Sequence, residues 1–446
     1  MSDVAVAPAR PAVGGGFRSF AWLWAGQTVS IFGSGLTAFA LGVWVYQTTG
    51  SVTRYTLIAA ATAIPTVLLS PFAGALVDRW NRRKTMLLAD LGAALGTVAL
   101  LGLLLADALQ AWHIYLIVAV QSAFGALQFP AFSAATTLLI PKRHFGRASG
   151  MLQFGQSGSR VLAPLVAGVL ISWIAIEGVI ALDLATFLLA AATLLLVRIP
   201  EPQRQAAGAG AVRPSLWREA GYGWVYLRQR PPLMALLAYF ALLNLLVPFV
   251  IVLATPMVLS FAGADELGLV LSLTSAGALA GGLLMSAWGG PERRMLGVLG
   301  FAPLIAAGFA LAALRPSVPL IAAGLFLAFF MMPVINGSSQ AIWQSKVAPE
   351  VQGRVFAMRR MVAQGTSPLA FLAAGPLADH VFEPLMAPGG ALAGTLGPLL
   401  GTGEGRGIAL LLLVLSALLL AATLWGLASP RLRDIESQIP DAELPG

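Results

Sequence analysis

The stretch GALVDRWNRRK, from Gly74 to Lys84, lies between two long apolar segments of this 446-residue chain. These segments are YTLIAAATAIPTVLLSPFAGALV (Tyr55–Val77) and TMLLADLGAALGTVALLGLLL (Thr85–Leu105). Each has roughly the 20 residues that an α-helix needs to cross a hydrocarbon core of about 30 Å. The sequence therefore predicts two membrane-spanning helices joined by a short, strongly basic turn.

The rest of the chain repeats this alternation of apolar segments and short loops. We predict twelve spans, at Leu23–Gln47, Tyr55–Val77, Thr85–Leu105, His113–Ile140, Ala148–Ile174, Val179–Val197, Leu233–Phe261, Leu267–Ala287, Met295–Leu314, Val318–Val347, Val355–Val381 and Ile408–Leu427. Only 10% of the residues are charged and 58% are hydrophobic, whereas about a quarter of the residues of a soluble domain are charged. The sequence thus predicts an all-α integral membrane protein.

A polar interval, Ile199–Pro232, divides the predicted helices into two groups of six. The expected organisation is a disordered cytoplasmic tail (1–20), a first six-helix bundle (21–198), a cytoplasmic linker (199–232), a second bundle (233–428) and a cytoplasmic C-terminal tail (429–446). The linker mixes aromatic and basic side chains in SLWREAGYGWVYLRQR. This mixture suits a helix lying in the membrane interface, and it is equally compatible with a simple tether.

The positive charge of the loops predicts the orientation in the membrane. If the N-terminus is cytoplasmic, the loops facing outside hold only Arg54, Arg315 and Arg406 among the Lys and Arg residues. Cytoplasmic loops of membrane proteins are enriched in Lys and Arg. We therefore expect a multi-pass protein of the cell membrane with both termini in the cytoplasm.

The two halves of the chain share a repeated segment. FPAFSAATTLLIPKRHFGRASGM (Phe129–Met151) corresponds to MPVINGSSQAIWQSKVAPEVQGRVFAM (Met332–Met358), with matching prolines and a matching Gly-Arg pair. Parallel repeats of this kind are found in transporters that rock two bundles about a central site. The repeat predicts two pseudo-symmetric bundles and alternating access.

The basic turn of the opening stretch suggests a conformational latch made of Gly74, Asp78, Arg79, Arg82 and Arg83. Glycine permits close approach of helices. The Asp78 carboxylate could pair with an arginine or with the N-terminus of a helix from the other half. The alternative is an ordinary basic cytoplasmic loop, which would explain the arginines but not the glycine and the aspartate.

The same stretch resembles the signature loop of the major facilitator superfamily, Gly-x-Leu-x-Asp-Arg-x-Gly-Arg-Arg, with Asn81 in place of the second glycine. The segments FRSFAWLWAGQTVSIFGSGLTAFAL, VAPEVQGRVFA and GPLADHVFEP resemble the drug:proton antiporter branch, which holds macrolide and siderophore (enterobactin-type) exporters. The resemblance implies the major facilitator fold, with twelve helices in two six-helix bundles, and a proton-driven efflux function.

Three ionisable residues inside the predicted spans are candidates for a proton or charge relay: Asp183, Arg160 and Asp90. Charged side chains are costly in the membrane and commonly functional there. We expect Arg160 and Asp183 to form an intramembrane pair, in which Asp183 either carries a proton or plays a static structural role. Asp90 is expected to pair with a basic residue near the cytoplasmic side, such as Arg147.

Uncharged polar residues interrupt several spans. In the superfamily, spans one, four, seven and ten usually line the cavity, so the resemblance implies these substrate-cavity candidates: Gln27, Gln128, Asn244, Asn336 and Gln340. Each could instead form a hydrogen bond between helices. Phe329 to Met332 could line an apolar pocket or pack in the core.

Several functions are excluded or disfavoured by the composition. The chain has no cysteine, and its three histidines lie far apart in the sequence, so we predict neither a metal site nor a cofactor. No phosphate-binding loop is present, and the basic residues belong to loops between spans, which argues against nucleic acid as a partner. We expect no enzymatic activity.

The sequence therefore predicts a monomeric secondary transporter whose partners are a small-molecule substrate, protons and the lipid bilayer. It would export bulky, largely apolar organic compounds, such as macrolide-like drugs or secondary metabolites, by proton-coupled alternating access. The alternatives are a siderophore or peptide exporter, and an importer or lysophospholipid flippase of the same fold.

Overall fold

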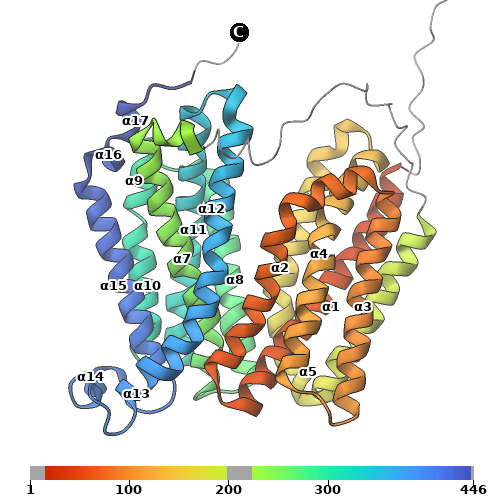
Figure 1. The fold of residues 1–446 in the computed structure, drawn as a ribbon, viewed down its shortest axis with the longest axis horizontal. Helices are drawn as coiled ribbons and strands as arrows, with labels where there is room; N and C mark the ends of the chain where they lie inside the picture. The colour runs from red at the N-terminus through yellow and green to blue at the C-terminus, as the bar shows by residue number, and fades with distance from the viewer. Residues whose placement is uncertain (1–15, 198–223, 443–446) are drawn as a thin grey trace, which may run out of the picture.

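The computed structural model describes residues 16–197 and 224–442, which form two helical bundles side by side (Figure 1). The predicted disordered tail lies mostly outside the described residues, but helix α1 already begins at Gly16 rather than after residue 20. Most of the predicted interfacial helix also lies outside them; residues 224–228 are helical.

The first bundle contains α1 (Gly16–Thr49), α2 (Val52–Arg79), α3 (Arg82–Leu105), α4 (Ala111–Leu139), the short η1 (Lys142–His144) and α5 (Phe145–Leu196). Helix α5 has 52 residues and is interrupted at Ala175, where φ is 55° and ψ is −177°. This left-handed backbone position falls between the fifth and sixth predicted spans.

The two halves of α5 run in opposite directions, as their packing on α1 shows. The close pairs are Gly155 with Thr28, Gly35 with Ala163, Gly26 with Thr193, and Gly33 with Thr186. In the first two pairs the residue numbers rise together along both helices, so the first half of α5 is parallel to α1. In the last two pairs they run oppositely, so the second half is antiparallel and is a separate span.

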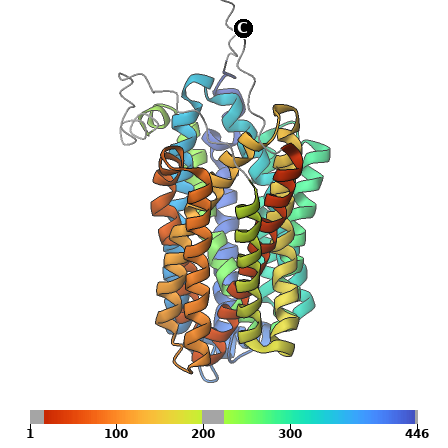
Figure 2. The ribbon, with the colours of Figure 1, turned by 90° about the vertical axis from the view of Figure 1, so that its right-hand side faces the viewer.

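The second bundle contains α7 (Pro231–Leu259), α8 (Ala264–Trp288), α9 (Arg294–Leu299), α10 (Ala302–Ala313), α11 (Val318–Lys346), α12 (Pro349–Leu377) and α15 (Arg406–Ala428). Shorter elements are η2 (Ala378–Phe382), α13 (Glu383–Met386), α14 (Ala393–Leu400), α16 (Pro430–Arg433) and α17 (Ile435–Gln438). Figure 2 shows that the long helices of both bundles run along a common direction.

Ten helices of the described residues are long and apolar enough to cross a membrane, with α9 and α10 counted as one. Helix α5 is one of the ten and contains two spans. Helix α12 is not among them, because its arginines, other polar residues and prolines lower its hydropathy, but its 29 residues span the bundle. These helices account for the twelve predicted spans, and the all-α membrane fold is confirmed.

The C-terminal residues 429–442 differ from the simple tail that the sequence predicted. Glu436 accepts hydrogen bonds from the backbone N–H groups of Arg294 (3.0 Å) and Met295 (2.9 Å), at the start of α9. Lys346 bonds to the Glu436 carbonyl oxygen at 2.7 Å and to the Asp441 carboxylate at 2.8 Å. These contacts hold the C-terminal segment against the start of α9 and the end of α11.

Helix packing in the second bundle depends on glycines that bring backbones together. A Cβ atom at Gly281 of α8 would overlap the backbone oxygen of Phe330 in α11, whereas one at the adjacent Gly282 would meet nothing within 4 Å. Small residues permit such close approach of helices in membranes. The α8–α11 contact therefore requires glycine at one of these two positions only.

We predict that Gly281→Ala lowers the thermal stability of the detergent-solubilised protein and that Gly282→Ala does not. Overpacking costs about 1–3 kcal/mol, which exceeds the roughly 1 kcal/mol that alanine gains over glycine in a helix. Thermal melting followed by size-exclusion chromatography measures both variants. Equal melting temperatures for the two would contradict the packing.

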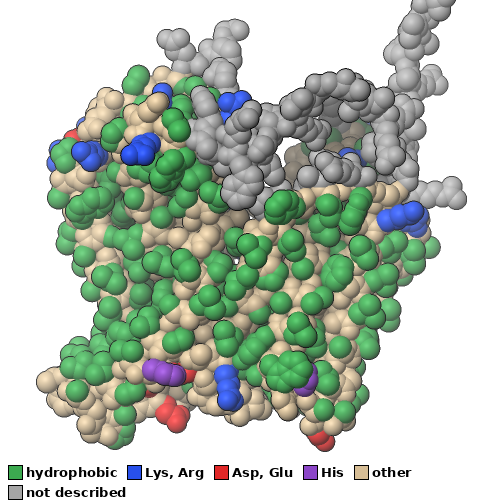
Figure 3. Space-filling model, viewed as in Figure 1, with side chains coloured by type: hydrophobic (Ala, Val, Ile, Leu, Met, Phe, Trp, Pro, Cys, Tyr) green, Lys and Arg blue, Asp and Glu red, His purple; other side chains and the backbone are tan. Residues whose placement is uncertain are grey.

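In the described residues, the main contacts between the two bundles lie near one end. We call the end that carries α16 and α17 the terminus face, and the end that carries α13 and α14 the loop face (Figure 1). The bundles diverge toward the terminus face and meet near the loop face, through contacts of α2 with α12 and of α5 with α8. Figure 3 shows the mainly apolar surface along the helices, with Lys and Arg near the terminus face.

Candidate functional site

A cavity of about 960 Å³ lies between the bundles; we call it the inter-bundle cavity. Its walls come from α1 and the first half of α5 on one side, and from α7, α8 and α11 on the other. Cavities of about 300–1,000 Å³ hold drug-sized ligands. The inter-bundle cavity is therefore large enough for a bulky organic molecule.

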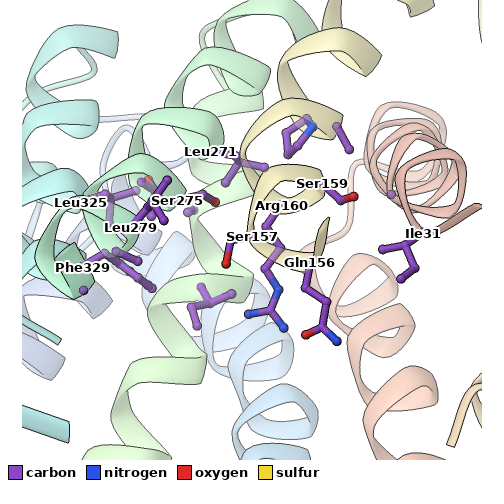
Figure 4. A pocket seen from close by; sticks show the side chains of 18 of the residues that line it. Ile31, Gln156, Ser157, Ser159, Arg160, Leu271, Ser275, Leu279, Leu325 and Phe329 are labelled. Atoms are coloured by element: carbon purple, nitrogen blue, oxygen red, sulfur yellow. The ribbon is translucent and has the colours of Figure 1, made fainter. Parts of the chain in front are cut away.

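The two walls of this cavity differ in chemistry. The α5 wall presents polar side chains, Gln156, Ser157, Ser159 and Arg160. The opposite wall is mainly apolar, with these side chains among its lining: Val250, Ile251, Leu271, Leu279, Leu283, Leu325 and Phe329. Figure 4 shows Ser157 on the side of α5 toward this wall, Gln156 and Arg160 extending side by side, and Ser159 on the side toward Ile31 of α1. Phe329 thus lines the cavity, which is one of the two roles that the sequence predicted for it.

A second cavity, of about 430 Å³, lies inside the first bundle among α1, α3, α4 and α5. Four of the predicted site residues line this first-bundle cavity: Gln27, Asp90, Gln128 and Asp183. Ile31 and Gln156 line both cavities, so the two adjoin each other. The structure therefore brings two intramembrane carboxyl groups next to the inter-bundle cavity.

Asp90 is the centre of a closed polar triad from three helices. The Gln27 amide donates to Asp90 Oδ2 at 3.1 Å, and the Gln128 amide donates to Asp90 Oδ1 at 2.8 Å. Gln128 also donates to Gln27 Oε1 at 2.6 Å. The triad links α1, α3 and α4. Both glutamines therefore form hydrogen bonds between helices, which is one of the two roles that the sequence predicted for them. Both also line the first-bundle cavity.

Asp183 is held differently, by hydroxyl groups. Ser34 of α1 donates to Asp183 Oδ1 at 3.4 Å, and the Thr186 hydroxyl lies 3.5 Å from the same oxygen. Gly33 leaves room for this carboxyl group, because a Cβ there would meet Thr186 and Asp183. Only 2% of Asp183 is accessible, so its carboxyl group is enclosed where α5 packs on α1.

Two predicted pairings are wrong in this structure. Arg160 and Asp183 form no ion pair, because Arg160 extends into the inter-bundle cavity while Asp183 faces α1. Asp90 does not pair with Arg147; the Arg147 guanidinium lies 4.8 Å from the Phe17 ring centroid instead. Both errors arise because the rotation of each helix about its axis decides which side chains meet.

The three remaining cavity candidates line neither of these cavities. Asn244 donates to the carbonyl oxygen of Phe240, one turn earlier in its own helix, at 2.7 Å. Gln340 accepts a hydrogen bond from Arg359 at 2.7 Å, and Asn336 is exposed. A polar residue inside a span can thus be satisfied within its own bundle, which sequence position alone does not reveal.

The predicted latch is described only in part. The surroundings of Gly74 and the side chains of Asp78 and Arg79 are not described, and Arg82 is half-buried. Arg83 donates to the carbonyl oxygens of Leu194 (3.1 Å) and Leu195 (2.5 Å), in the last turn of α5. A cation at a helix C-terminus is stabilising, so Arg83 joins α3 to α5 within the first bundle.

A contact that the sequence interpretation missed joins the bundles at the loop face. The Asp379 carboxylate of η2 accepts hydrogen bonds at the start of α2, from the Ser51 hydroxyl (2.8 Å) and from the backbone N–H groups of Val52 (3.0 Å) and Thr53 (2.8 Å). Gly375 packs directly against Thr53. An acidic residue at a helix N-terminus satisfies free N–H groups and the helix dipole.

We predict that Asp379→Ala weakens the closed loop face. Loss of such a cap costs about 0.5–2 kcal/mol, so the state open to the terminus face loses population by a factor of about 2 to 30. Because the chain has no cysteine, spin labels at Lys84→Cys and Arg431→Cys report the distance between the bundles at the terminus face. A larger short-distance population is expected in the variant.

The matched control is Glu404→Ala, which removes an exposed acidic residue between α14 and α15. It should leave the distance distribution unchanged. An unchanged distribution in Asp379→Ala as well would mean that the cap contributes nothing to the balance between states.

Helices α5 and α8 make the second contact at the loop face. A Cβ at Gly268 would overlap the Pro164 carbonyl oxygen, and one at Gly168 would overlap the Ala264 carbonyl oxygen. Arg160 lies one helical turn from Pro164 toward the terminus face. The glycine contacts therefore close the inter-bundle cavity on the loop-face side.

The chain matches the Major Facilitator Superfamily over residues 23–371. It is 27% identical to the macrolide efflux protein A of Streptococcus pyogenes over 381 residues, covering 81% of this chain and 90% of that protein. It is 26% identical to the multidrug efflux pump Tap of Mycolicibacterium fortuitum over 360 residues, covering 78% and 86%.

Two solved structures share the fold. A bacterial homologue of the human lysosomal transporter Spinster, in an inward-facing and unoccupied conformation, superposes with a TM-score of 0.67 at 16% identity, covering 91% of this chain and 95% of the other. The nucleoside transporter NupG superposes with a TM-score of 0.67 at 12% identity, covering 92% and 99%.

The family match covers most of the chain, from α1 to within α12, and includes every residue that lines the two cavities. It agrees with the prediction of a transporter rather than an enzyme. This protein belongs to the Major Facilitator Superfamily and is a multi-pass secondary transporter distantly related to macrolide and multidrug efflux pumps.

Proposed function

We propose that the protein exports bulky, largely apolar organic compounds by proton-coupled alternating access. The observation that carries this proposal is the junction of the two cavities at Ile31 and Gln156. One cavity has the size and the apolar wall for a cargo, and the other encloses Asp90 and Asp183. A proton that binds at one of these carboxyl groups would act next to the cargo.

The volume of the inter-bundle cavity and the names of the relatives support a macrolide-like drug or secondary metabolite as cargo. With both termini in the cytoplasm, as the loop charges predict, the described state would accept cargo from the cytoplasm. Closure of the terminus face and opening of the loop face would then release it outside. We expect the protein to work in the cell membrane as a monomer.

The carboxyl groups of Asp90 and Asp183 are not equally suited to carry a proton. In this structure the amide NH2 groups of Gln27 and Gln128 donate to the two oxygens of Asp90, so Asp90 is held as an acceptor. The hydroxyl groups of Ser34 and Thr186 can donate to a carboxylate or accept from a carboxylic acid. Asp183 is therefore the better candidate for the exchangeable proton, and Asp90 for a fixed member of the triad.

Siderophore or peptide export is the second candidate function, because Arg160 is the charged side chain that lines the inter-bundle cavity in the described residues. An importer or lysophospholipid flippase of the same fold is the remaining alternative. Direction of transport distinguishes the importer from both exporters.

The test is accumulation of a macrolide without a basic amino group in an efflux-deficient bacterial host that expresses the chain, with and without a protonophore. Lower accumulation in expressing cells, restored to the level of control cells by the protonophore, is expected. Accumulation that rises on expression, or exclusion that persists without the gradient, would contradict proton-driven export.

A further inference from the structure

Arg160 is an intramembrane cation without a counter-ion among the described residues. It lies near the middle of the first half of α5, its side chain is exposed to the inter-bundle cavity, and it makes no hydrogen bond or ion pair with any described residue. Asp183 and Asp90 are bound to other partners in the first-bundle cavity. A charge at this depth is costly without a partner, so the arginine indicates a functional role.

Two further donors lie beside it on the same helix. Gln156 and Ser157 precede Arg160 by four and three residues, which places all three on one face of α5. Figure 4 shows the Gln156 amide and the Arg160 guanidinium extending side by side into the cavity. Neither Gln156 nor Ser157 has a hydrogen bond to another described residue, so all three groups are available to a ligand.

Of the three hydroxyl groups on the opposite wall, those of Thr274 and Ser286 are bound to backbone, and that of Ser275 has no hydrogen bond to a described residue. Thr274 donates to the Val270 carbonyl oxygen at 2.8 Å, and Ser286 donates to the Gly282 carbonyl oxygen at 2.8 Å. No acidic side chain is among the described residues that line this cavity. The cavity therefore offers hydrogen-bond donors and one positive charge on α5, facing a mainly apolar surface on α7, α8 and α11.

We propose that the inter-bundle cavity selects amphipathic organic anions, whose carboxylate or sulfonate binds Arg160, Gln156 and Ser157 while the apolar body packs against Leu271, Leu279 and Phe329. A guanidinium matches a carboxylate in a bidentate geometry, and it repels an ammonium group. This inference rests on the proposed function, because it takes the inter-bundle cavity as the cargo site.

The first experiment compares three probes with one aromatic body: pyrenebutyrate, its neutral methyl ester, and pyrenebutylammonium. Binding to the purified full-length protein in detergent is followed by quenching of tryptophan fluorescence. A charge-assisted hydrogen bond is worth roughly 1.5–3 kcal/mol, so the carboxylate should bind about 10-fold to 100-fold more tightly than the ester. The ammonium probe should bind more weakly still.

The second experiment repeats the comparison in Arg160→Gln and Arg160→Lys. In Arg160→Gln the preference for the carboxylate over the ester should fall to about one, because no charge remains. Arg160→Lys should keep part of the preference. Arg54→Gln, which removes an exposed arginine at the loop face, should keep all of it. The ratio between variants is independent of probe partitioning into the micelles.

Equal binding of carboxylate and ester by the wild-type protein would overturn the inference, as would a full preference in Arg160→Gln. The comparison within the wild-type protein does not depend on the variants folding. If the protein exports the ester under a proton gradient but binds the carboxylate no more tightly, the inference fails and the proposed function stands. If it binds the carboxylate selectively but never transports it, the proposed function fails instead.

Discussion

Asp183→Asn is expected to abolish proton-driven export while the protein still folds and binds cargo. The substitution keeps the size of the side chain and its place among Ser34 and Thr186, but asparagine cannot take up or release a proton. In an efflux-deficient host, cells that express the variant should accumulate substrate to the level of cells without the transporter. The effect on export should be tenfold or more, since coupling is lost rather than weakened.

The matched control for this prediction is Asp107→Asn. Asp107 is exposed after the end of α3 and has a positive φ of 51°, which asparagine tolerates. This control should export normally. The contradicting result is that Asp183→Asn still exports substrate and that this export depends on the gradient and on pH as in the wild type. Asp183 would then not carry the proton, and another group would.

Gly268→Val is expected to produce the second large loss of transport, through the α5–α8 contact. Even a Cβ at this position would overlap the Pro164 carbonyl oxygen of the first bundle, and backbone cannot move aside as a flexible side chain can. Overpacking of about 1–3 kcal/mol would reduce the population closed at the loop face by a factor of about 5 to 150. Transport should fall because one of the two alternating states is lost.

The control for the glycine contact is Gly102→Val in α3, where an added Cβ meets nothing within 4 Å. It should retain transport. The spin-label pair at Lys84 and Arg431 distinguishes the mechanism, because Gly268→Val should shift the terminus face toward the closed distance. Loss of transport with an unchanged distance distribution would show that the contact does not control the conformational balance.

The number and place of the spans were predictable from the sequence, because the length of an apolar segment is a local property. The turn at Ala175 illustrates this: the interval between Ile174 and Val179 was predicted as a loop, and the packing on α1 shows the chain reversing there, although the helix is continuous by its hydrogen bonds. Arg354, Arg359 and Arg360 did not obscure α12 as a span either.

The partners of the intramembrane residues were not predictable in the same way. Gln27, Asp90 and Gln128 come from three helices that are far apart in the sequence, and their meeting depends on the rotation of each helix. The Asp379 contact joins residues more than 300 positions apart, between the two bundles. Nothing local in the sequence indicated which carboxylate would approach the start of α2.

The C-terminal segment shows an intermediate case. Leu432 and Ile435 are fully buried, and their apolar character was visible in a segment that the sequence interpretation treated as a tail. The hydrogen bonds of Glu436 to the start of α9 were not visible, because they depend on how the second bundle presents that helix end. The sequence analysis therefore predicted a tail where the structure has a packed segment.

The central claim is that cargo movement and proton movement are coupled through Asp183. The most direct measurement reconstitutes the purified protein in liposomes, imposes a pH gradient, and records pyrenebutyrate flux and proton flux together. We predict that cargo moves against the proton flow, that reversing the gradient reverses the cargo flux, and that Asp183→Asn abolishes the coupled proton flux. Cargo flux that is indifferent to the size and sign of the pH gradient would contradict the account.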